Sequence, residues 1–306
     1  MDGRCSLTGL PKAGKANRGA LTNLCRLARA IAARKPEPQE ISSMASAAPT
    51  QSLPLLYNAI EPLNATQHSK MNVRAIDAMP QAGRTHAIPV TVDEFALIQR
   101  HYPIVFSIGD SPVPLALMGL NEGVNVFLDA DGKPLDTNLY IPAYLRRYPF
   151  LLARLRPDSD ELSLCFDPTV GAVGEFEDGQ ALFDGDKPSE ATTAILQFCE
   201  QFEAAGQRTA AFMDELVKSD LLMDGEVAIQ PEGFEQPFVY RGFRMVDEEK
   251  LRNLRGDELR KMNQSGMLPL VYAHLFSLSE TRNVFSRQME QGKAPAPAPQ
   301  LSPEIA

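Results

Sequence analysis

Residues 140–167 read YIPAYLRRYPFLLARLRPDSDELSLCFD. Pro142 is expected to begin a short helix that extends to Tyr148, because proline suits the first turn of a helix. The apolar runs at 150–156 and 161–167 flank the turn sequence Pro-Asp-Ser-Asp, which is typical of a β-hairpin. This stretch alone therefore predicts a chain that mixes helices with antiparallel strands.

The residues before this stretch alternate short apolar runs with turns. A helix is expected over 93–100, with Asp93 near its cap position. Strands are predicted for four β-branched or aromatic runs: 86–92, 102–107, 114–119 and 125–129.

The residues after the hairpin are mostly helical in pattern. Apolar side chains recur at a spacing of three to four over 189–218, which predicts an amphipathic helix with a break at Gly206. The later elements are expected to be a strand at 238–246 and helices at 247–254, 257–264 and 270–278. Together these patterns predict an α+β fold, in which an antiparallel-rich sheet from the first half is covered by helices from the second half.

The composition is typical of a globular protein, with 44% hydrophobic and 23% charged residues among 306. A transmembrane helix needs about 18 consecutive apolar residues, and the chain contains no such run. We therefore expect no integral membrane insertion. Three zones are predicted: a disordered or spurious leader at 1–52, an α+β domain at 53–290, and a disordered Pro/Ala tail at 291–306.

The charge is distributed unevenly along the chain. Eight basic residues and one acidic residue give residues 1–35 a charge of +7, so the net charge of −9 leaves −16 on the other 271 residues. A body this acidic repels phosphate backbones, which argues against nucleic-acid binding. The basic segment fits a leader outside the working protein, with Met44 as an alternative start, or a targeting peptide, or a functional arm.

Motifs for common chemistries are missing from the sequence. Cys165 and Cys199 are 34 residues apart and form no CxxC pair, which favours free thiols in a reducing compartment. We therefore expect a cytoplasmic protein, with a peripheral association with the envelope as the alternative. HExxH, GxSxG and GxGxxG do not occur, and the acidic turn that starts at Asp129 lacks the Gly and Glu positions of an EF-hand. We therefore expect no metal and no cofactor, and a binding protein rather than an enzyme. His274 is interpreted as a packing residue.

The candidate binding site lies in the opening stretch. It comprises Tyr140, Tyr144, Arg146, Arg147 and Tyr148. Paired arginines among aromatic rings suit a carboxylate, a phosphate or a peptide strand. The same residues also suit a core-facing helix whose arginine stems cover a sheet edge, and no nucleophile or general base lies nearby in the sequence.

These segments together resemble the SapC family of bacterial proteins associated with surface-layer secretion. The resemblance runs in family order from about 55 to 285 and rests on these pieces: HYPIVF at 101–106, PLALMGLNEGVNVF at 114–127, YIPAYLRRYPF at 140–150, LSLCFD at 162–167, LFD at 182–184, GFRMVDEEKL at 242–251 and LVYAHLFSL at 270–278. One departure is the absence of Trp before the Tyr-Ile-Pro motif, where the family often has one. A membrane permease carries the same name, but the absence of a long apolar run excludes it.

The resemblance implies a role in the export of surface-layer or envelope proteins, with no catalytic residues to transfer. The first hypothesis is therefore an accessory protein that binds an export component or an envelope client. The second is a protein or enzyme that binds a small anion through Arg146 and Arg147. The third is attachment to DNA or to a membrane through residues 4–35.

Overall fold

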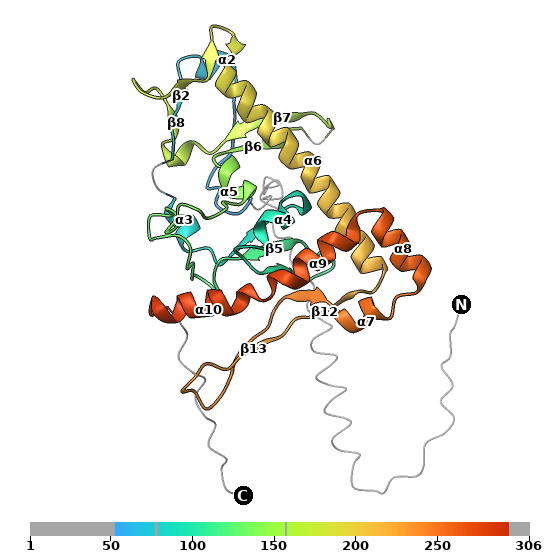
Figure 1. Cartoon of the computed structure of the whole chain (residues 1–306). Helices are drawn as coiled ribbons and strands as arrows, with labels where there is room; N and C mark the ends of the chain where they lie inside the picture. The colour runs from blue at the N-terminus through green and yellow to red at the C-terminus, as the bar shows by residue number, and fades with distance from the viewer. Residues whose placement is uncertain (1–52, 77–78, 157, 294–306) are drawn as a thin grey trace, which may run out of the picture. The chain divides into compact units, whose positions relative to one another are not determined.

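The computed structural model describes residues 53–76, 79–156 and 158–293. The predicted leader at 1–52 and the part of the predicted tail from 294 onward lie outside these residues. In the described part, antiparallel strands alternate with helices, and the longest helices follow the first sheets along the chain (Figure 1). The α+β prediction is therefore confirmed. No helix in this part of the chain is long and apolar enough to cross a membrane.

The largest sheet has five antiparallel strands in the order β12-β15-β4-β5-β3. Its members are β3 (Ala87–Pro89), β4 (Ile104–Phe106), β5 (Pro114–Leu117), β12 (Leu222–Asp224) and β15 (Arg244–Val246). Arg244 lies opposite Phe106 and so joins the late strands to the early ones. The sheet therefore draws on both halves of the chain, although the sequence placed it in the first half alone.

A second sheet contains the hairpin of the opening stretch. It joins β1 (Glu61–Pro62), β7 (Leu162–Phe166) and β6 (Phe150–Arg154), in that order. Phe150 lies opposite Phe166, and Arg154 lies opposite Leu162. The predicted hairpin is thus confirmed.

The remaining strands are short and form small sheets. In one of them, β2 (Asn72–Val73) pairs on its two sides with β8 (Val173–Gly174) and β9 (Gln180–Ala181). Two further pairs are β10 (Phe183–Asp184) with β11 (Lys187–Pro188), and β13 (Val227–Ile229) with β14 (Phe238–Tyr240).

Short helices connect the early strands and longer ones close the chain. The early set is α2 (Ala65–His68), α3 (Pro80–Gly83), the 3-10 turn η1 (Val92–Glu94), α4 (Phe95–Ile98), α5 (Ala143–Arg147) and the 3-10 turn η2 (Pro168–Val170). The late set is α7 (Glu248–Arg252), α8 (Gly256–Gln264), α9 (Met267–Ser277) and α10 (Glu280–Glu290).

The long helix α6 (Glu190–Lys218) packs along two hydrophobic cores. It begins at Ser189, whose side chain accepts a hydrogen bond from the Thr192 backbone N–H, as an N-cap residue does. Near its start, Cys199 belongs to the core under the β6–β7 hairpin. Near its end, Phe212 and Leu216 belong to the larger core under the five-stranded sheet. In Figure 1 the helix runs from beside α2 at one end to α8 at the other.

Helix α9 packs against the central sheet through His274, which is fully buried. Its Nε2 atom accepts a hydrogen bond from the Val246 N–H, 3.1 Å away, and its Nδ1–H donates to the Ile104 carbonyl at 2.7 Å. Burial lowers the pKa of this imidazole to about 4, although the bond to Ile104 acts in the opposite direction. The neutral ring therefore joins α9 to both β15 and β4, in agreement with its interpretation as a packing residue.

Three local predictions were wrong. The run 125–129 forms only an isolated bridge at Leu128. The Asn125 side chain accepts hydrogen bonds from the backbone N–H groups of Phe127 and Leu128, so these groups are not available to a neighbouring strand. The run 238–246 forms two strands, because the chain turns at Gly242, where φ is +93°. Helix α6 continues through Gly206, since the packing of its flanking turns outweighs the cost of about 1 kcal/mol for an internal glycine.

Candidate functional site

Glu94 fixes the start of the Tyr-Ile-Pro segment. This carboxylate is buried, and its Oε1 atom accepts hydrogen bonds from the Ala143 N–H at 2.6 Å and the Tyr140 hydroxyl at 2.9 Å. Its Oε2 atom accepts two more from the backbone and side chain of Thr91. The carboxylate thus joins η1 to the first turn of α5, where negative charge is also favourable. Burial and the adjacent Glu94 charge raise the pKa of Tyr140 to about 12.

Arg146 lies on the exposed side of α5 and bends back over its own segment. Its Nε atom donates to the Ile141 carbonyl, and its Nη2 atom donates to the Tyr140 hydroxyl, both at 3.0 Å. The guanidinium also lies 5.4 Å from the Tyr140 ring centroid and 5.2 Å from that of Phe198 on α6. Its head group is therefore held in one place although it is open to solvent.

Arg147 is buried, with 8% of its surface exposed, and points under α6. Its guanidinium lies 4.2 Å from the Phe202 ring centroid and 4.7 Å from that of Tyr144. Its Nη1 atom is 3.4 Å from the Glu203 carboxylate, whereas its buried Nε atom has no hydrogen-bond partner among the described residues. Because Phe198 and Phe202 are one turn apart, the two arginines hold α5 against consecutive turns of α6.

The other two predicted tyrosines serve the fold. The Tyr144 hydroxyl donates to the Leu55 carbonyl at 2.8 Å, and the Tyr148 hydroxyl lies 3.3 Å from the Asp167 carboxylate. Burial raises the pKa of both phenols, and the nearby Asp167 charge raises that of Tyr148 further. Both tyrosines therefore stay protonated, with their hydroxyls hydrogen-bonded to other segments.

A cleft of about 970 Å³ opens beside these residues. We call it the α5–α6 cleft. It is lined by residues 73–76 and 179–180 with their neighbours Met79 and Asp178, by residues 145–150, and by one face of α6 that includes Ala194, Ile195, Phe198 and Cys199. The five residues of the predicted site therefore fall into two groups. Arg146, Arg147 and Tyr148 line the cleft, whereas Tyr140 and Tyr144 lie outside it and support α5.

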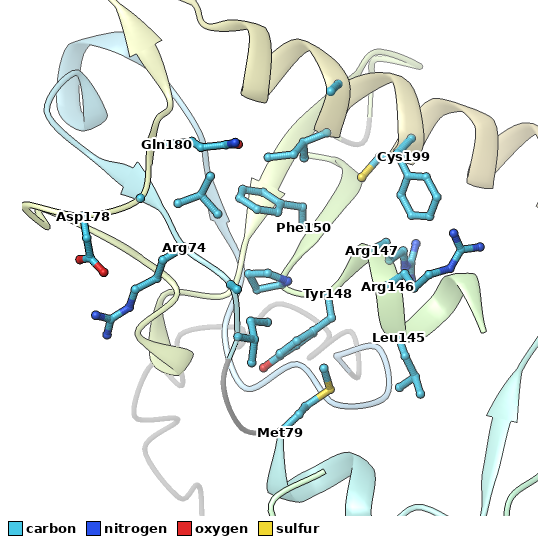
Figure 2. A pocket seen from close by; sticks show the side chains of 18 residues that line it. Arg74, Met79, Leu145, Arg146, Arg147, Tyr148, Phe150, Asp178, Gln180 and Cys199 are labelled. Carbon is cyan, nitrogen blue, oxygen red and sulfur yellow. The ribbon is translucent and has the colours of Figure 1, made fainter. Parts of the chain in front are cut away.

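Cationic groups lie on two sides of an apolar floor in this cleft (Figure 2). Phe150 occupies the middle of the view, Arg74 and Asp178 lie on one side of it, and Arg146 and Arg147 lie on the other. The Cys199 sulfur lies near Phe150, and burial raises the pKa of this thiol to about 11, so it is protonated at neutral pH. An arrangement of this kind can hold an apolar ligand that carries negative charge.

Sequence reasoning missed the contribution of the distant wall residues. Arg74 and Asp178 are separated by more than 100 positions, and both come to the cleft because β2 pairs with β9. Each of these strands has only two residues, which is too short to give a periodic pattern. No motif or periodic pattern in the sequence marks Arg74 or Asp178.

The acidic turn at Asp129 is occupied by the chain itself. One of its carboxylate oxygens accepts hydrogen bonds from the backbone N–H groups of Asp131 and Lys133, at 2.9 and 2.8 Å. The turn is therefore a closed structural motif. Across the ranges that the structure describes, no three His, Cys, Asp or Glu side chains are grouped as metal ligands would be.

Comparison with known protein families identifies the family of this chain. The family model named SapC matches residues 63–284, which is more than two thirds of the chain and includes every strand and helix that lines the cleft. The searches of curated proteins and of solved structures found no match.

Proposed function

This chain belongs to the SapC family, and on that premise we propose that it is a cytoplasmic accessory protein for the export of surface-layer or envelope proteins. In this proposal it acts by binding a protein partner, which is either an export component or an envelope client. The partner binds at the α5–α6 cleft.

The observation that supports this proposal is the chemistry of the cleft. Its floor offers apolar side chains, including Phe150 and Ile195, and its walls carry three arginines against one aspartate. Burial raises the pKa of Tyr148 and of Cys199, so both groups stay protonated. The nearby carboxylate of Asp167 accepts hydrogen bonds from Asn58 and Thr169. Such a surface suits recognition better than bond chemistry.

The test is an affinity pull-down from native cells with the full chain tagged at its C-terminus. Ala194 is exposed and lines the cleft, so Ala194→Glu introduces bulk and negative charge there without removing a core side chain. Gln197 is exposed on the same helix outside the cleft lining, which makes Gln197→Glu the matched control.

We expect mass spectrometry to identify a secretion or envelope protein that the wild type and Gln197→Glu enrich and Ala194→Glu loses. Enrichment of the same protein by all three baits would show that the cleft is not the binding site. Absence of any such protein from the wild-type sample would overturn the accessory role itself.

A second function, small-anion binding, is favoured by one observation: the buried Nε atom of Arg147 has no hydrogen-bond partner among the residues that the structure describes. It is opposed by the contacts that this guanidinium already makes with Glu203 and with Phe202. A bound anion would stabilise the folded state by a free energy of RT ln(1 + [L]/Kd) and would therefore raise the melting temperature. A thermal-shift screen of phosphate, sulfate and small carboxylates should show a stabilising anion whose effect Arg147→Ala removes; a flat screen of the wild type would exclude this function.

A further inference from the structure

From the two-sided charge of the cleft we infer the chemistry of the partner segment: an extended peptide stretch in which apolar side chains are flanked on both sides by carboxylates. This inference rests on the proposed function and specifies what the cleft recognises. The apolar centre would bind at Ile195 and Phe198, and the carboxylates would bind at Arg74 and Arg146.

The floor of the cleft supplies the apolar contact. Ile195 is half-buried and packs against the core under the hairpin, and Phe198 is half-buried one turn further along α6. Pro149 and Ile76 complete this lining. These side chains are anchored in packed elements, so a ligand that covers them removes apolar surface from water without having to order the site first.

Arg74 provides a cation that is already held in position. Its Nε atom donates to the Gly171 carbonyl at 3.2 Å, and its guanidinium lies 4.0 Å from the Phe176 ring centroid. The residue is exposed, so its terminal nitrogens remain accessible to a ligand. A carboxylate that binds here forms a charged hydrogen bond with Arg74, and little conformational entropy of the Arg74 side chain is lost because this side chain is already held in position.

Arg146 provides the second such cation. Its contacts with Ile141, Tyr140 and Phe198 use Nε, Nη2 and the face of the guanidinium. An exposed edge remains for an acceptor, as at Arg74. Arg74 and Arg146 are thus held in the same way: each has an exposed guanidinium that contacts a backbone carbonyl and an aromatic ring.

The spacing of the two cations argues for an extended ligand. Figure 2 shows Arg74 and Arg146 on opposite sides of Phe150, which favours an extended ligand over a single small anion. A peptide with acidic residues on each side of an apolar centre matches both arginines and the floor between them. The positive lining also contrasts with the net charge of −9 on the chain, so an acidic segment is attracted to this cleft in preference to the rest of the surface.

The test uses two synthetic peptides, capped at both ends and labelled with tetramethylrhodamine. The acidic probe has two aspartates on each side of Leu-Phe-Leu-Leu, and its twin has asparagines in their place. Fluorescence anisotropy is measured with the full-length wild type, Arg74→Gln, Arg146→Gln and Ala194→Glu. The control is Arg260→Gln, which changes an exposed arginine of α8 outside the cleft.

The acidic probe should bind the wild type at least about tenfold more tightly than its twin, which is the range expected for one or two charged hydrogen bonds. Arg74→Gln and Arg146→Gln should each reduce this preference several-fold. Ala194→Glu should abolish binding of the acidic probe. Arg260→Gln should leave both the affinity and the preference unchanged. Equal binding of the two peptides, or no saturable binding of the acidic probe, would overturn the inference.

The two proposals fail in different ways. If Ala194→Glu loses the envelope partner in the pull-down while the two peptides bind equally, the accessory function stands and the carboxylate recognition is wrong. If the pull-down yields no envelope partner while the wild type prefers the acidic probe, the cleft chemistry stands and the proposed function is wrong.

Discussion

At the scale of single residues, buried polar groups specify where segments meet. Glu94 accepts four hydrogen bonds, from Thr91, Tyr140 and Ala143. A buried carboxylate is costly unless its hydrogen bonds are satisfied, and here donors from two distant segments satisfy it together. This side chain is therefore one of the groups that fix the position of α5, and with it one wall of the cleft.

We predict that Glu94→Ala lowers the free energy of unfolding by about 3 kcal/mol, because it leaves buried donors without an acceptor. Glu94→Gln should cost less, since the amide oxygen keeps part of the acceptor role. Urea denaturation followed by circular dichroism measures both. Glu200→Ala, an exposed position on α6, is the control, and a loss at Glu94 no larger than at Glu200 would contradict the prediction.

At the scale of elements, aromatic and charged contacts join the short helix α5 to the long helix α6. Helix α5 has five residues, too few to be stable in isolation. It is held on α6 because Arg147 lies under Phe202 and pairs with Glu203, while Arg146 lies over Phe198. The paired arginines, which the sequence presented as a binding candidate, thus also build the wall of the cleft.

Arg147→Ala is expected to destabilise the protein by about 2–3 kcal/mol, because it leaves a void beside the Tyr144 and Phe202 rings and removes the partner of Glu203. Arg147→Met should recover part of this loss by filling the volume. Arg146→Ala, at the exposed neighbour, should cost less than about 1 kcal/mol. Chemical denaturation of the three variants tests this order, and equal losses for both alanine variants would be inconsistent with the buried role of Arg147.

Helix α9 gives the fold a specific dependence on pH. The pKa of buried His274 is about 4 in the folded protein, against about 6.5 in an unfolded chain. As pH falls below about 6.5 the unfolded state binds a proton that the folded state does not bind. The unfolded state is therefore favoured progressively down to about pH 4, where the accumulated loss is about 3 kcal/mol.

The measurement is the free energy of unfolding between pH 7 and pH 4 for the wild type and for His274→Gln. The wild type should lose stability across this range, and the variant should lose about 3 kcal/mol less than the wild type does, although it starts from a lower value. An identical pH dependence in the two proteins would assign the effect to other groups.

At the scale of the whole molecule, late parts of the chain complete structures that early parts begin. Gln288 on α10 is fully buried, and its side chain accepts a hydrogen bond from the Leu120 N–H at 2.6 Å and donates one to the Asn121 side chain at 2.9 Å. Nearby, Gln291 and Lys293 donate to the carbonyls of Val126 and Asn125. Four side-chain bonds thus join the end of the described chain to a loop more than 160 residues earlier.

Gln288→Ala should therefore lower the free energy of unfolding by about 2 kcal/mol, because the Leu120 N–H loses its acceptor and the buried space is left unfilled. Glu290→Ala, at an exposed position on the same helix, should change it by less than about 0.5 kcal/mol. Thermal and urea denaturation of the two variants provide the comparison, and a neutral Gln288→Ala would show that α10 does not stabilise the loop.

The sequence by itself determined the local elements and the class of the fold. The β6–β7 hairpin and the capped helices α6 and α7 follow from turn residues, cap residues and periodic apolar positions. These signals act over a few residues, so they can be read along the chain. The ordered motifs that resemble SapC extend over the same region, and the matching family model bears them out.

Only the tertiary structure decided which strands pair across the chain and where the cleft lies. The pairing of β15 with β4 and of β2 with β9 joins residues more than 100 positions apart. Such pairing depends on the mutual burial of surfaces from whole elements, which no local pattern encodes. For the same physical reason, Arg74 lines the cleft without any motif around it, while Tyr140 and Tyr144 lie in the most conspicuous motif and support it from outside.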